Sequence, residues 1–74
     1  MNSPAIILHN RALERYEAYN EDGRMITART LPFGSFVWTL RCYGYTHVPL
    51  NSRLGRTIWD KLPLTTQMQI NPKG

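Results

Sequence analysis

The chain has 74 residues, of which 42% are hydrophobic, with a formal net charge of +4 and one cysteine. This length leaves room for a single domain, and one cysteine excludes an internal disulfide, which favours a cytoplasmic setting. No apolar run approaches the roughly 20 residues of a membrane span, and no secretory leader is recognisable, so we expect no membrane partner.

Charge is divided unevenly along the chain. Residues 1–23 hold two arginines against four carboxylates, whereas residues 24–74 hold seven cations against one carboxylate. Arginine has a planar fork of donors that suits bidentate contact with phosphate or carboxylate, so an anionic partner is predicted. The alternative is that these are ordinary solvated side chains that keep the domain soluble. Five arginines have no acidic neighbour in sequence: Arg24, Arg29, Arg41, Arg53 and Arg56.

The first apolar run is Ala-Ile-Ile-Leu at residues 5–8, for which we expect an extended conformation. Two roles are open for it. It docks on its own domain, as chain termini commonly do, or it is an exposed arm that adds as a strand to a partner's sheet. In the second case the docking residues are Ile6, Ile7 and Leu8.

Residues 10–22 are predicted to form an N-terminal helix. The segment is rich in helix formers, and its two tyrosines fall near one helical face that would meet the core. A hairpin with its turn at Asp22 and Gly23 is the alternative, because this pair favours tight turns and would join strands at 16–21 and 24–31.

An antiparallel sheet is predicted over residues 24–46. The segment 24–31 alternates and contains β-branched residues, Pro32 and Gly34 supply a turn, and 35–46 is typical of a long returning strand. Alternation along that strand places one set of side chains in the core: Phe36, Trp38, Leu40 and Cys42.

A short C-terminal helix is predicted over residues 52–62, with Asn51 or Ser52 as its cap and Pro63 after its end. Leu54, Ile58 and Leu62 recur every four residues and are expected to face the core. Together these elements predict a small α+β protein with a single compact domain at residues 1–64 and a flexible polar tail at 65–74.

Catalytic and metal-binding patterns are sparse, so we expect neither an enzyme nor a cofactor. Cys42 and His47 could act as nucleophile and base, but no third group orients the histidine. A metal site would need His9 to join them without any paired ligand spacing. A metal-independent ribonuclease toxin, with arginines acting beside His47, Tyr43 and Tyr45, is the remaining enzyme hypothesis.

The inventory of residues favours a binding protein. Tryptophan, tyrosine and arginine are enriched at protein-binding hot spots, so the preferred hypothesis is a small regulator or inhibitor that docks on a larger protein. A small single domain without a catalytic set is typical of phage regulators. By that analogy, the chain would act on a host nucleic-acid machine, such as RNA polymerase in transcription regulation, or on a defence complex. Direct nucleic-acid binding is the alternative. The candidate binding residues are Arg53 and Arg56 beside Trp59, then Arg41, Arg29, Tyr43 and Tyr45.

Overall fold

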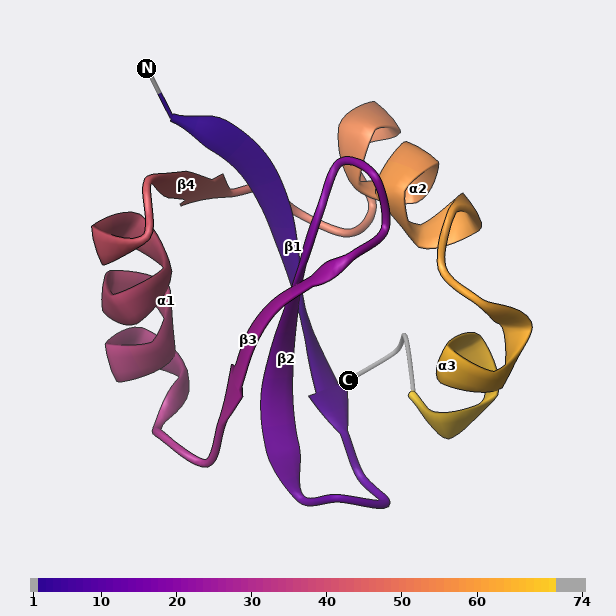
Figure 1. The fold of residues 1–74 in the computed structure, drawn as a ribbon, viewed down its shortest axis with the longest axis horizontal. Coiled ribbons are helices and arrows are strands. Elements are labelled where there is room, and N and C mark those ends of the chain that lie inside the picture. The colour runs from indigo at the N-terminus through magenta and orange to yellow at the C-terminus, as the bar shows by residue number, and fades with distance from the viewer. Residues whose placement is uncertain (1, 71–74) are drawn as a thin grey trace.

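A four-stranded mixed sheet separates two layers of helix in the computed structural model, which describes residues 2–70 (Figure 1). The helix α1 covers one face of the sheet, while α2 and α3 lie on the other side. The strand order is β3-β2-β1-β4. In chain order the elements are β1 (Ser3–Asn10), β2 (Arg15–Asn20), β3 (Met25–Arg29), α1 (Phe33–Cys42), β4 (Tyr45–His47), α2 (Arg53–Asp60) and α3 (Leu64–Gln69).

The first three strands form an antiparallel meander, and β4 returns parallel to β1 at its other edge. The β2–β3 turn uses Gly23 at φ +79°, a conformation that favours glycine. The side chain of Asn20 accepts hydrogen bonds from the backbone N–H groups of Asp22 and Arg24, at 2.9 and 3.0 Å. The turn at Asp22 and Gly23 therefore connects β2 and β3 as a hairpin.

Strand β1 lies in the middle of the sheet and is buried on both faces. Ala5 belongs to the core beneath α1, whereas Ile6 and Leu8 belong to the core beneath α2. A strand covered on both sides is typically a continuous apolar run, which explains why no alternation is visible at residues 5–8. The expected extended conformation is confirmed. Because β1 pairs with β2 and β4 in the same sheet, it is docked on its own domain and is not a free arm for a partner.

The predicted helix over residues 10–22 is wrong, and the hairpin alternative describes the structure. Residues 15–20 form β2, where the neighbours Ala18 and Tyr19 are both buried because they face opposite layers of the core. Local helix propensity is a weak preference that tertiary packing overrides. Here the burial of a short strand on both faces favours the strand conformation over the helix.

The long strand predicted over residues 35–46 is also wrong, because residues 33–42 form α1 and only 45–47 form a strand. Phe36 and Leu40 are four apart and fully buried, which is the spacing of one helical face. Trp38 and Cys42, which alternation placed in the core, are exposed.

The end of α1 follows a common helix-termination pattern. Gly44 adopts φ +88° directly after the helix, and its N–H donates to the carbonyl of Arg41 at 3.0 Å. A left-handed glycine just after the last turn satisfies a carbonyl group that the helix leaves free.

The C-terminal helix is confirmed as α2. Ser52 caps it, since its hydroxyl accepts a hydrogen bond from the N–H of Gly55 at 3.0 Å. Ile58 and Leu62 are buried as expected, but Leu54 is exposed.

Part of the segment that the sequence assigned to a flexible tail belongs to α3, and the buried Ile70 bridges to Asn10 of β1. Residues 71–74 lie outside the described residues.

The α+β class is confirmed, with a mixed rather than purely antiparallel sheet. No helix within residues 2–70 has both the length and the apolarity needed to cross a bilayer.

The two aromatic residues of α1 should differ sharply in their contribution to stability. Phe36→Ala should lower the free energy of unfolding by about 3–5 kcal/mol because it empties a fully buried position. Trp38→Ala should change it by about 0.5 kcal/mol or less, as is usual for exposed positions. Urea titration of both variants measures the difference, and similar losses would contradict the helical assignment.

The two helical glycines provide a second matched pair. A Cβ at Gly55 would lie 2.0 Å from the carbonyl oxygen of Pro49, whereas a Cβ at Gly34 meets nothing within 4 Å. Gly55→Ala should therefore cost about 1–3 kcal/mol through overpacking. Gly34→Ala should be neutral or stabilise by up to about 1 kcal/mol, because alanine restricts the unfolded chain. Thermal melts of the two variants moving in the same direction would contradict the close approach of α2 to residue 49.

Candidate functional site

The outward side of α1 carries an exposed tryptophan beneath an arginine. Trp38 is 65% exposed, and the guanidinium carbon of Arg41 lies 5.9 Å from the centroid of its ring, within the range of a cation–π contact. Residues three and four apart on a helix are neighbours, so Trp38, Arg41 and Cys42 share one face. That face lies opposite the buried Phe36 and Leu40.

A second arginine–aromatic pair joins the end of α1 to β3. The Nη2 group of Arg29 donates a hydrogen bond to the hydroxyl of Tyr43 at 3.1 Å, and Tyr43 is 49% exposed. This hydrogen bond from Arg29, followed by one from Thr27, lowers the pKa of the Tyr43 phenol below its ordinary value. The hydrogen bond brings the two side chains together at the surface.

The segment that forms this part of the structure contains no carboxylate. The stretch that includes β3, α1 and β4 contains no aspartate or glutamate, since none occurs between Gly23 and Trp59. Within the described residues the only ion pair joins Arg15 to Glu17. We call the following set the α1 surface, which is positive and aromatic and has no internal charge partner: Arg29, Trp38, Arg41, Cys42 and Tyr43.

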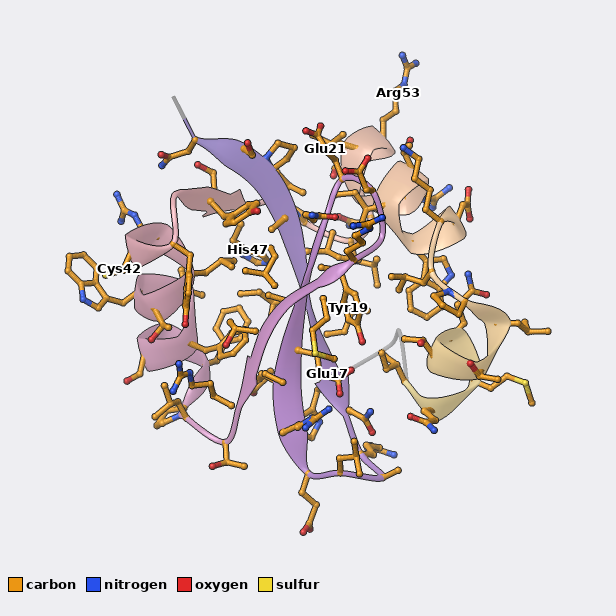
Figure 2. The ribbon with its side chains drawn as sticks, in the orientation of Figure 1. Glu17, Tyr19, Glu21, Cys42, His47 and Arg53 are labelled. Atoms are coloured by element: carbon orange, nitrogen blue, oxygen red, sulfur yellow. The ribbon has the colours of Figure 1, made fainter. Side chains whose placement is uncertain are left out.

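The two arginines that the sequence analysis ranked first lie elsewhere. Arg53 and Arg56 are exposed on α2, and Figure 2 shows Arg53 extending away from the molecule, on the other side of the sheet from Cys42. Trp59 is partly buried against the core beneath α2. The fold therefore divides the predicted binding residues between two opposite sides.

Tyr45, the remaining aromatic candidate, is only partly exposed. It lies on β4 and packs against the core beneath α1. Two further candidates, Ile6 and Leu8, are buried in β1, and Ile7 packs against the core beneath α1. These four side chains contribute to the interior of the domain more than to a binding surface.

A row of aromatic rings runs beneath the N-terminal end of α1. The ring centroids are 5.0 Å apart for His9 and Tyr16, 5.6 Å for Tyr16 and Phe33, and 5.6 Å for Phe33 and His47. Burial lowers the pKa of His47 below its ordinary value. The sequence analysis did not single out Phe33, and a helical interpretation of residues 33–42 would have placed it beside the sheet.

On the other face of the sheet, a buried carboxylate is enclosed by polar partners (Figure 2). Glu17 accepts hydrogen bonds from the amide of Asn10 at 3.1 Å, the Nε group of Arg15 at 2.9 Å and the hydroxyl of Tyr19 at 2.7 Å. Burial raises the pKa of the Tyr19 phenol, and the hydrogen bond to Glu17 raises it further. Both carboxylate oxygens of Glu17 accept hydrogen bonds from these side chains, so we interpret the group as a structural hydrogen-bond network. The sequence analysis did not single out Glu17 as a buried residue.

The groups considered for catalysis or metal binding are arranged as follows. The imidazole of His47, on β4, meets the ring of Phe33 edge to face, whereas Cys42 is exposed on the outward side of α1 (Figure 2). His9 contacts Tyr16. Across residues 2–70, no group of three or more histidine, cysteine or acidic side chains is placed to hold a metal ion.

Comparison with known protein families, with curated proteins and with solved structures found no match to this chain.

The half-buried His47 predicts a pH-dependent stability. Its folded pKa lies below the ordinary value of 6.5, so as the pH falls the unfolded chain takes up the proton first. The contribution of neutral His47 is therefore complete above about pH 6.5 and decreases as the pH falls below that value. Melting temperatures between about pH 7.5 and about pH 5.5 should fall more steeply for the wild type than for His47→Gln.

His9→Gln, at an exposed position of β1, is the matched control for this measurement. Parallel pH profiles for the wild type and His47→Gln would contradict the burial of the imidazole.

Proposed function

We propose that this chain is a small regulatory protein that binds a larger protein through the α1 surface. The observation that carries the proposal is the exposed Trp38 beneath Arg41, together with the Arg29–Tyr43 pair, in a segment without carboxylates. Tryptophan, tyrosine and arginine are the residue types that dominate binding hot spots.

Contacts within the domain partly order the α1 surface before a partner binds. Phe36 and Leu40 fix the helix to the sheet, and each arginine already rests on an aromatic ring or its hydroxyl group. Side chains that are ordered in advance lose less conformational entropy when they bind. A fitting partner offers an apolar recess for the indole of Trp38 and carboxylates on either side for Arg29 and Arg41.

Direct nucleic-acid binding has less support from the arrangement of cations. A protein that follows a phosphate backbone gathers its cations along one groove or stripe. Here Arg29 and Arg41 lie on the α1 side, while Arg53 and Arg56 lie on α2 beyond the sheet. The ribonuclease hypothesis also has less support, because the phenol of Tyr43 accepts a hydrogen bond from Arg29 and His47 meets Phe33 edge to face. That the partner is a nucleic-acid machine remains a prediction from the sequence.

Capture from a bacterial lysate, with and without nuclease treatment, tests this proposal when three proteins are compared. The wild type should retain a protein partner after nuclease treatment. Trp38→Ala should weaken its capture by about 30-fold or more, the equivalent of about 2 kcal/mol. The double variant Arg53→Ala, Arg56→Ala is the matched control, which removes two exposed cations from the opposite side and should retain the partner.

Two results would contradict the proposal. The first is loss of all captured protein after nuclease treatment. The second is binding to random DNA or RNA at physiological salt in which the two pairs of arginines contribute equally, with the slope of log affinity against log salt falling by about one per arginine removed.

A further inference from the structure

Strand β3 is an edge of the sheet, and the register identifies which of its backbone groups point outward. Asn20 donates its N–H to the carbonyl of Arg24, so alternate residues of β2, counted back from Asn20, bond toward β3. Ala18 and Tyr16, the next two in that series, pair with Thr27 and Arg29. The residue between them, Ala28, therefore directs its N–H and C=O groups away from β2.

In the described part of the chain, the outward backbone groups of Ala28 have no hydrogen-bond partner, although the residue is partly buried. Neither backbone nor side-chain hydrogen bonds reach Ala28 from outside the β2–β3 ladder within residues 2–70. In Figure 1 β3 crosses in front of β2, with α1 to its left and the other helices to its right. An unpaired edge of this kind is a template for another strand.

Charge decides which strand fits. Arg29 is the last residue of β3, and Arg24 directly precedes the strand, next to a turn that holds Glu21 and Asp22. No carboxylate occurs between Gly23 and Trp59. A second copy of β3 paired antiparallel would bring the arginines of one copy toward those of the other, and like charges that face each other across two strands oppose self-association. An acidic extended segment would instead meet the positive charge of Arg29, at the end of the edge that adjoins the α1 surface.

We infer that the β3 edge accepts an extended acidic segment of the partner protein as a fifth strand, a step that rests on the function proposed above. Side chains of the added strand would alternate between the two faces of the sheet. Those on the α1 side would lie beside Thr27 and Arg29, where a carboxylate pairs with the guanidinium. Those on the other side would lie beside Ala28, whose small side chain leaves room for an apolar residue. The edge and the α1 surface share Arg29 and thus form one continuous binding region.

The probe that tests this inference is a synthetic peptide of alternating glutamate and valine, compared with its lysine–valine counterpart. Titration into the protein, followed by NMR, should show binding of the acidic peptide alone. Amide exchange at Ala28 should slow by about tenfold or more in the complex, because its free N–H becomes hydrogen-bonded. Equal binding of both peptides, no binding at millimolar peptide, or an unchanged Ala28 amide would overturn the inference.

Two substitutions at one position separate the backbone from the side chain. Ala28→Pro removes the outward N–H without removing a β2–β3 hydrogen bond and should abolish binding of the acidic peptide, since proline is tolerated on edge strands. Ala28→Val keeps the N–H and should retain binding. Amide spectra establish that each variant is folded, and the exchange measurement on the unchanged protein stands if Ala28→Pro does not fold.

Capture from the lysate distinguishes the failure of this inference from failure of the proposed function. A partner that requires Trp38 but is retained by folded Ala28→Pro would overturn the fifth strand and leave docking through α1 intact. A partner lost by Ala28→Pro but retained by Trp38→Ala would support the edge and overturn the role of the α1 surface.

Discussion

Burial of β1 on both faces is the constraint on which the other elements depend. On the α1 side the sheet presents the small residues Ala5 and Ala18, and this allows α1 to approach closely enough to bury Phe36 completely. On the other side the large Ile6 packs in the same cluster as Ile58 of α2. A strand that serves two cores fixes the position of both helical layers, and interiors of this density leave little freedom for either helix to rotate. Trp38 is consequently held at the surface by the same packing that buries Phe36.

The buried carboxylate of Glu17 adds a polar constraint to this apolar framework. It connects Asn10 at the end of β1 with Arg15 and Tyr19 of β2, and Asn10 also reaches Gln69 of α3 at 3.5 Å. A buried charge that is fully hydrogen-bonded contributes little net stability, but leaving it unpaired is costly, so this network penalises alternative registers of the β1–β2 hairpin. Glu17 therefore determines the register of the β1–β2 hairpin more than it contributes to its stability.

Sequence patterns predicted some of the elements whose signals were local, and failed where two periods coincide. The cap at Ser52 depends on nearby side chains and was predicted, whereas the turn at Asp22 and Gly23, which is equally local, was only the alternative to a helix over residues 10–22. Phe36 and Leu40, by contrast, share a face of either a strand or a helix, because four residues complete two strand repeats and about one helical turn. That single ambiguity also hid the candidate site. Trp38 and Arg41 lie on opposite faces of a strand, yet they are neighbours on a helix.

The parallel pairing of β1 with β4 has a consequence for how the chain assembles. The meander of β1, β2 and β3 closes through short turns, whereas the second edge of β1 must wait for residues 45–47, far along the sequence. Contacts between distant segments form slowly, because the entropy of closing the intervening loop has to be overcome first. During that interval the apolar residues of β1 have one unpaired edge. Folding speed around α1 therefore governs how long the chain is exposed to aggregation through its first strand.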